Sequence, residues 1–143
     1  MALGSIRHHR IVKHRADRVW EIAGDPARLH EWFPGITRCE VDGTRREITL
    51  GNGLVMPEEI VVRDDLQMRF QYRITAPLFV FHRGTIDVIA LDEESCIAIY
   101  TTEADPRAMA LVVAGASCEA LANLDELLTR NDPADNSAHM EMH

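Results

Sequence analysis

Six consecutive extended segments separated by very short turns are the feature that most constrains the fold of this chain. The segments are rich in β-branched and aromatic residues and run over 37–42, 45–50, 55–63, 68–75, 80–91 and 96–104. The breaks between them hold turn residues, as at Asp42-Gly43. Because such breaks are too short for crossover helices, consecutive strands must be antiparallel neighbours in a meander.

One strand and two short helices are predicted before this meander. Residues 6–15 are polar and β-branched and indicate an opening strand, and apolar residues recur at helical spacing over 16–23. A second short helix is predicted from Asp25-Pro26 to Trp32, since Asp is a favoured N-cap and Pro is favoured at the first helical position.

A long helix is predicted after the meander, beginning at Asp105-Pro106 and ending near Arg130. Its apolar stripe consists of Ala110, Ala114, Ser117, Leu121, Leu124 and Leu128. Only this helix is long enough to cover the apolar face of a curled sheet. The first half of the stripe is built from small side chains, so we expect space between that half and the sheet.

The length of 143 residues suits one domain with one core. We expect this domain over residues 1–130. Residues 131–143 are polar and contain Pro133, so they are predicted to form a disordered C-terminal tail.

The charge balance restricts the partners. With 15 basic and 23 acidic residues the net charge is -8, which opposes nucleic acid and anionic membrane surfaces. A hydrophobic small molecule fits better than a nucleic acid. No run of about 18 apolar residues is seen, so we expect no integral membrane association. The oligomeric state stays open between monomer and homodimer.

The cysteine content indicates the compartment. Cys39, Cys96 and Cys118 are widely spaced and odd in number, which is typical of reduced thiols rather than of a disulfide framework. We expect them to be small core residues in a cytoplasmic protein.

A resemblance to a known superfamily is carried by Val19-Trp20, Asp25-Pro26, Trp32-Phe33-Pro34-Gly35, Glu58, Asp64-Asp65 and Asp105-Pro106. With the order of elements, these residues resemble the polyketide cyclase/dehydrase-like members of the START-related (Bet v 1-like, SRPBCC) superfamily over roughly residues 5–130. The resemblance implies an α+β helix-grip fold, in which a curved antiparallel seven-stranded sheet wraps a long C-terminal helix around an apolar cavity. It also implies a binder of lipids, polyketides or sterols, sometimes a cyclase or dehydratase.

A row of polar side chains is predicted inside this cavity. Over 68–75, apolar residues including Tyr72 alternate strictly with Gln and Arg, which places Tyr72 on the inner face. The same reasoning turns Glu58 inward on the preceding strand and His82 inward on the following one. Centring the two hairpins on their turn residues places Glu58 opposite Tyr72, and Tyr72 opposite His82.

These three residues are the candidate catalytic group. Burial raises the pKa of a carboxyl and His titrates near neutrality, so Glu58 and His82 could divide the acid and base roles, with Tyr72 as hydrogen-bond donor. This equipment suits proton abstraction beside a carbonyl. Two alternatives stand: a structural hydrogen-bond network, or a group that only orients a ligand.

Other inward positions complete the predicted cavity wall. The candidate ligand-binding residues are Trp32, Phe33, Met56, Phe70, Gly84, Tyr100, Thr102, Ser117 and Leu121. Trp32 and Phe33 are expected to form a lid at the mouth, or else to cap the core. For Gly84 a bulge is the alternative to close approach of a ligand, and for Tyr100 packing on the helix is the alternative to lining.

The sequence predicts no cofactor and no metal, because it shows no phosphate-binding Gly-rich loop and no complete ligand set around His8, His9 or His14. The expected function is binding of a hydrophobic, aromatic or cyclic small molecule, with aldol cyclisation or dehydration as the candidate chemistry. One alternative is a non-enzymatic carrier of lipid or quinone. Another is a protein- or ribosome-associating module that uses the basic first strand.

Overall fold

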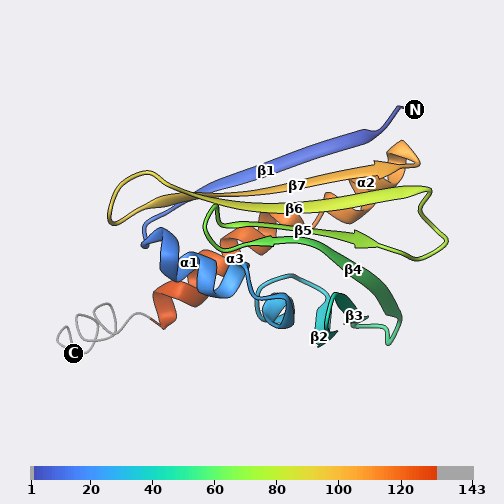
Figure 1. The fold of residues 1–143 in the computed structure, drawn as a ribbon, viewed down its shortest axis with the longest axis horizontal. Helices are drawn as coiled ribbons and strands as arrows, with labels where there is room; N and C mark the ends of the chain where they lie inside the picture. The colour runs from blue at the N-terminus through green and yellow to red at the C-terminus, as the bar shows by residue number, and fades with distance from the viewer. Residues whose placement is uncertain (1, 132–143) are drawn as a thin grey trace.

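The protein folds around a seven-stranded antiparallel sheet (Figure 1). The computed structural model describes residues 2–131. The strands are β1 (Gly4–Val12), β2 (Ile36–Asp42), β3 (Arg45–Leu50), β4 (Val55–Asp64), β5 (Arg69–Ile74), β6 (Phe81–Ala90) and β7 (Cys96–Asp105). Their spatial order is β1-β7-β6-β5-β4-β3-β2. The meander from β2 to β7 is therefore confirmed, and the first strand closes the sheet beside the last.

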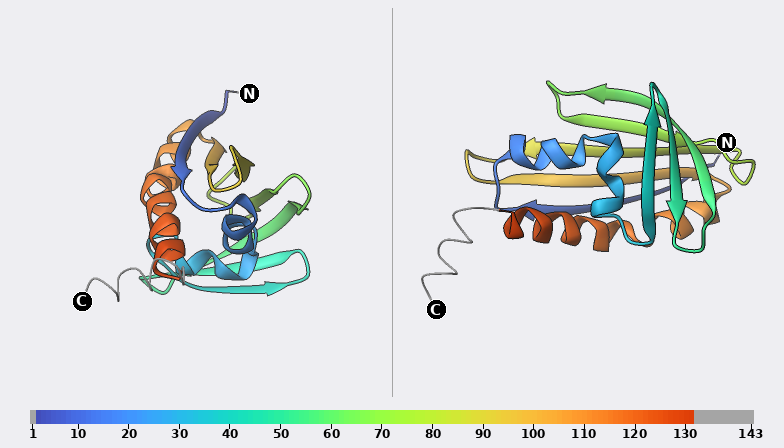
Figure 2. Two further views of the ribbon diagram at one scale, coloured as in Figure 1. Left: turned by 90° about the vertical axis from the view of Figure 1, so that its left-hand side faces the viewer. Right: turned by 90° about the horizontal axis from the view of Figure 1, so that it is seen from below.

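Four helical segments lie on the concave side of this sheet or at its end. They are α1 (Ala16–Ala23), the 3-10 helix η1 (Pro26–Glu31), α2 (Arg107–Ala114) and α3 (Ser117–Arg130). Figure 2 shows the sheet curling round the helices, with α2 and α3 running along one side. This is the predicted α+β helix-grip architecture.

Two predicted boundaries are corrected. The first strand ends at Val12 rather than at residue 15, because Lys13 and His14 form a bend before α1. The predicted long helix is two helices, separated at Gly115 and Ala116. Gly is a poor helix former, which favours a break at this point. The Ser117 hydroxyl stabilises the connection between the two helices by donating to the carbonyl of Ala114 at 2.7 Å.

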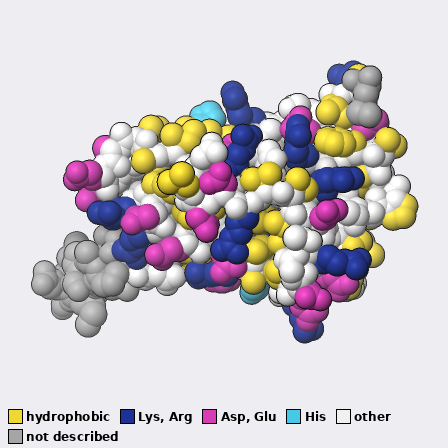
Figure 3. All heavy atoms as spheres, viewed as in Figure 1, with side chains coloured by type: hydrophobic (Ala, Val, Ile, Leu, Met, Phe, Trp, Pro, Cys, Tyr) yellow, Lys and Arg dark blue, Asp and Glu magenta, His cyan; other side chains and the backbone are white. Residues whose placement is uncertain are grey.

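The alternation of faces follows the prediction. Phe70, Tyr72 and Ile74 are buried on β5, and Glu58 and His82 are buried on β4 and β6. The outer face carries cross-strand ion pairs such as those of Arg69 with Asp87 and Arg83 with Glu103. Figure 3 shows side chains of both charges spread among apolar ones on the outer side of the sheet.

The predicted strand register is wrong by two residues. Glu58 lies opposite Ile74 rather than Tyr72, and Tyr72 lies opposite Gly84 rather than His82. The β4–β5 turn is longer than two residues, and a bulge shifts the pairing between Ile60 and Val62. Because the error is an even number, every side chain stays on its predicted face.

The helical stretch Arg107–Arg130 is long and apolar enough to cross a bilayer by length and composition alone, which the sequence analysis did not expect. The core helix of a helix-grip fold passes the same test. Here Leu121, Leu124 and Leu128 are buried, so we interpret the stretch as that core helix. The predicted tail falls almost wholly on residues 132–143, which lie outside the described residues.

The beginning of η1 gives a first testable prediction. The carboxylate of Asp25 accepts a hydrogen bond from the backbone N–H of Ala27 at 2.9 Å, which confirms the predicted N-cap. Asp25→Ala should lower the free energy of unfolding by about 1 kcal/mol, because this N–H loses its partner. Urea denaturation measures the loss, and Asp25→Asn, which keeps an acceptor, should show a much smaller one.

Candidate ligand-binding cavity

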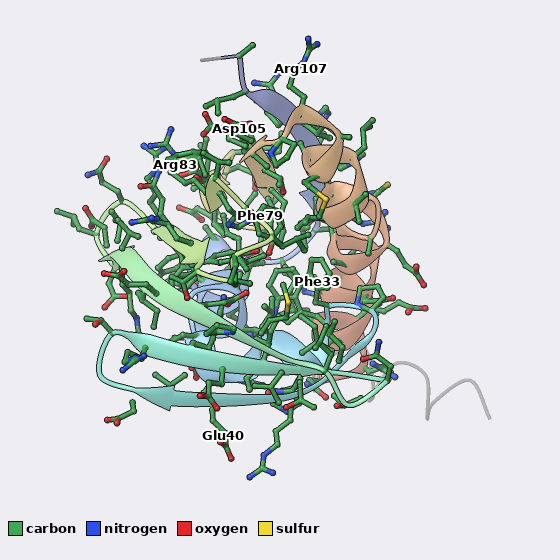
Figure 4. All side chains as sticks on the ribbon, turned by 90° about the vertical axis from the view of Figure 1, so that its right-hand side faces the viewer. Phe33, Glu40, Phe79, Arg83, Asp105 and Arg107 are labelled. Carbon is green, nitrogen blue, oxygen red and sulfur yellow. The ribbon has the colours of Figure 1, made fainter. Side chains whose placement is uncertain are left out.

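A cavity of about 480 Å³ lies between α2, the strands β3 to β5 and the loops at one end of the sheet. Its lining residues include Leu29, Phe33, Ile48, Leu50, Met56, Glu58, Tyr72, Ile74, Phe79, Tyr100, Met109, Val113 and Ala116. Leu54, Leu78 and Val112 belong to the lining and are also exposed to solvent, so they mark the mouth. Figure 4 looks toward this end and shows Phe33 and Phe79 between α2 and the sheet.

The cavity lies where the sequence predicted space. Helix α2 buries only Ala110 and Ala114, and these short side chains leave space beside its half-buried Met109 and Val113, which line the cavity. The larger Leu121 and Leu124 of α3 fill the other half of the concave side. The position of the cavity is therefore set by the change from small to large residues along the C-terminal helices.

Glu58 forms part of the wall and belongs to a buried ion pair. Glu58 on β4 lies opposite Arg46 on β3. The Arg46 Nε donates to Glu58 Oε1 at 2.7 Å, and its Nη2 lies 2.6 Å from the same oxygen. The two side chains are 2% and 1% exposed. Burial raises the pKa of the Glu58 carboxyl, although the Arg46 charge opposes that rise.

The sequence analysis missed Arg46. A signal was present in the sequence, because Arg46 lies two residues from Ile48 on β3 and therefore shares the inner face with it. The third guanidinium nitrogen of Arg46, Nη1, donates to the carbonyl of Pro26 at 3.1 Å. Its guanidinium also lies over the Tyr72 ring, 4.8 Å from the centroid. Arg46 thus connects η1, the carboxylate and an aromatic ring of the cavity.

Two tyrosine hydroxyls meet at the cavity wall. The Tyr72 and Tyr100 hydroxyl oxygens are 2.5 Å apart, and burial raises the pKa of both phenols. Only one hydrogen lies between the two oxygens. The hydroxyl that accepts in this bond therefore keeps its own hydrogen as a donor for a third group.

Gly84 explains how these tyrosines reach each other across β6. A Cβ atom on Gly84 would lie 2.4 Å from Cζ of Tyr72. The Tyr72 ring therefore lies flat over the glycine and extends towards Tyr100 on β7. The predicted role of Gly84 as a ligand contact is replaced by this one, since Gly84 is not among the lining residues.

His82 lies behind the cavity wall rather than in it. It is 1% exposed and contacts the rings of Tyr72 and Phe79, both of which line the cavity. The backbone N–H of Ile74 donates to its Nδ1 at 2.9 Å. Burial, together with the Arg73 charge, lowers the pKa of His82 to about 4, so the ring is neutral at neutral pH. A neutral ring of this kind is a hydrogen-bond donor and does not serve as a proton reservoir.

Of the predicted lining residues, Phe33, Met56 and Tyr100 line the cavity together with Glu58 and Tyr72. Trp32, Phe70, Thr102, Ser117 and Leu121 are buried outside the lining. Phe33 alone of the predicted aromatic lid reaches the cavity, because Trp32 turns into the core and is 2% exposed. Cys118, expected in the core, is exposed.

A wider hollow of about 1000 Å³ lies along β2, β3 and β4 and is lined by charged residues such as Glu40, Glu47 and Glu59. Arg46 and Glu58 also line it, so Glu58 belongs to both hollows. Figure 4 shows Glu40 pointing away from the apolar cavity. We place the candidate site in the apolar cavity, because ligand sites combine apolar walls with a few converging polar groups.

The arrangement supplies a base and a donor. Both Arg46 contacts to Glu58 reach Oε1, and within residues 2–131 no hydrogen bond to Oε2 is formed. Oε2 is therefore available to a ligand as an acceptor or a base. The free hydroxyl hydrogen of the tyrosine pair is available as a donor. A ligand with an acidic C–H beside a carbonyl matches both groups.

Solved structures with the same fold are numerous. XoxI from Bacillus cereus is 16% identical, with a TM-score of 0.80 over 87% of this chain and 95% of that chain. A START superfamily protein from Mycobacterium smegmatis is 14% identical, with a TM-score of 0.74 over 90% and 99%. Norcoclaurine synthase from Thalictrum flavum is 18% identical, with a TM-score of 0.72 over 92% and 89%. These likenesses show the fold.

The sequence itself identifies the family. No curated protein matches it significantly. The family described as polyketide cyclase/dehydrase and lipid transport matches residues 4–129, which is nearly the whole described chain. That description and the apolar cavity support a role in binding hydrophobic molecules. The chain therefore belongs to the polyketide cyclase/dehydrase and lipid transport family.

Proposed function

We propose that this protein binds a hydrophobic, aromatic or cyclic molecule that carries a carbonyl oxygen. The observation that carries the proposal is the Tyr72–Tyr100 hydroxyl pair on the wall of an otherwise apolar cavity. A volume of about 480 Å³ lies within the usual range for small-molecule sites. The norcoclaurine synthase structure holds dopamine and hydroxybenzaldehyde, an aromatic carbonyl compound, in the same fold.

The proposed chemistry is acid–base. Glu58 Oε2 takes a proton from the carbon beside the carbonyl, and the tyrosine pair donates a hydrogen bond to the enolate oxygen that forms. In an aldol closure, the enolate carbon then attacks a second carbonyl of the same molecule, whose oxygen takes up a proton. In a dehydration, the proton and a hydroxyl group leave together as water. Desolvation supports this assignment, because it makes the buried carboxylate a stronger base than one in water.

Deuterium exchange tests this proposal without knowledge of the natural ligand. Acetylnaphthalene has an apolar ring system and acidic C–H bonds beside its carbonyl. In D₂O, the protein should accelerate exchange of these hydrogens, which NMR follows directly. Glu58→Gln should lower the catalysed rate by at least about a hundredfold, because it removes the base while its amide oxygen can still accept from Arg46. Since the guanidinium loses its charged partner, thermal denaturation checks first that the variant is folded.

Tyr72→Phe provides the matching variant for the donor. It should weaken binding of acetylnaphthalene by about tenfold, the effect of one lost hydrogen bond, and leave binding of ethylnaphthalene unchanged. Binding without any catalysed exchange would support the non-enzymatic carrier instead. Failure of both compounds to bind would contradict the proposal.

The other alternative is less well supported. A protein- or ribosome-associating module that uses the basic first strand predicts a filled core, and the described residues enclose a cavity. Salt-sensitive association with a macromolecule would be the observation in its favour.

A further inference from the structure

His82 carries a buried hydrogen-bond donor that nothing in residues 2–131 satisfies. Because the Ile74 N–H occupies Nδ1, the hydrogen of the neutral ring is on Nε2. Nε2 has no partner among the described residues, although the side chain is 1% exposed. An unpaired buried donor destabilises the fold, so an acceptor that reached it would recover that free energy.

The groups between this donor and the cavity are aromatic. The His82 ring centroid is 5.5 Å from that of Tyr72 and 5.2 Å from that of Phe79. Both rings line the cavity, so His82 lies one layer of side chains behind its wall. Tyr72 is fixed by Tyr100, Arg46 and Gly84, whereas Phe79 belongs to the loop between β5 and β6.

Phe79 is the more easily displaced of the two rings. It is half-buried, and its neighbours Leu78 and Val80 are 56% and 73% exposed. Its edge-to-face contact with His82 is an apolar one that leaves the Nε2 donor unpaired. Exchanging this contact for a hydrogen bond to a ligand would therefore be favourable.

We propose that His82 Nε2–H binds a second oxygen of the ligand when the Phe79 ring turns aside. The ligand class follows from the placement of the two donors. The tyrosine pair holds one oxygen, and His82, whose ring centroid is 5.5 Å from that of Tyr72, holds another. The preferred ligand is thus an aromatic compound with two nearby carbonyl oxygens. This inference rests on the proposed function, since it adds a second subsite to the same cavity.

Three related compounds separate the subsites: ethylnaphthalene has no oxygen, acetylnaphthalene has one carbonyl and naphthoylacetone has two. His82→Asn is the central variant, because its side-chain oxygen can still accept from the Ile74 N–H while the ring donor is lost. The variant should bind naphthoylacetone about tenfold more weakly and bind the other two compounds as the wild type does. Thermal denaturation checks that its fold is retained.

Two further measurements address the donor and the ring that covers it. In NMR spectra, the His82 Nε2–H resonance should move downfield with naphthoylacetone and stay in place with acetylnaphthalene. Phe79→Ala should strengthen naphthoylacetone binding in the wild-type background and have a smaller effect beside His82→Asn, since the two changes act on one subsite.

The outcomes distinguish this inference from the proposed function. If none of the three compounds binds, both the proposed function and the His82 subsite are refuted. If all three bind and His82→Asn leaves the affinity for naphthoylacetone unchanged, or lowers all three affinities equally, the His82 subsite is refuted and the proposed function stands.

Discussion

Arg46→Met should lower the free energy of unfolding by about 3–5 kcal/mol. The substitution leaves the Glu58 carboxylate buried without its charged partner. It also removes the hydrogen bond to the Pro26 carbonyl and the cation that lies over the rings of Tyr72 and Phe70. Urea denaturation followed by circular dichroism measures the loss.

A double variant provides the control for this prediction. Arg46→Met with Glu58→Leu replaces the pair by apolar side chains of similar size, and such replacements of buried ion pairs are often neutral or stabilising. The double variant should therefore recover most of the stability that the single variant loses. A single variant as stable as the wild type, or a double variant as unstable as the single one, would contradict the view that the unpaired charge causes the loss.

Gly84→Ala should lower the free energy of unfolding by about 1–3 kcal/mol and also weaken binding of carbonyl compounds. The new Cβ would overlap the Tyr72 ring at 2.4 Å from Cζ, and this ring is buried, at 4% exposed. Moving the ring separates its hydroxyl from that of Tyr100. The affinity for acetylnaphthalene should then fall as it does in Tyr72→Phe.

Gly51→Ala is the matched control, because its Cβ would meet only the Gly35 carbonyl oxygen at an ordinary 3.9 Å. It should change stability by less than about 0.5 kcal/mol. Equal losses from the two glycine substitutions would contradict the view that the displaced tyrosine causes the loss, because the change in backbone entropy from Gly to Ala favours the folded state.

The faces of the strands could be predicted from sequence because charge reports them. Arg and Gln alternate with apolar residues on β5, so Tyr72 had to face inward, and the same pattern placed Glu58. The register could not be predicted in this way. It depends on the length of the β4–β5 turn and on the bulge near Val61, and neither feature changes the alternation of the side chains.

The composition of the site was harder to predict than its position. The small residues of α2 located the cavity, but the partner of Glu58 had to be found in three dimensions, since Arg46 looks like one of two adjacent surface arginines. His82 was predicted to face inward and does so. Its separation from the cavity depends on the Phe79 ring, which belongs to a loop without periodicity.

The interruption at Gly115 divides the C-terminal helical stretch into α2, which lines the cavity, and α3, which is buried in the core. Three leucines fix α3 in the core, and burial of each contributes about 1.5–3 kcal/mol. Helix α2 buries only two alanines and exposes Leu111 and Val112. Helix α2 nevertheless packs closely on β1 and β7, where a Cβ atom on Gly4 would lie 2.9 Å from Cβ of Ala110. The half of the helical stretch that lines the cavity is therefore held by close approach of the backbone, whereas the other half is held by large side chains.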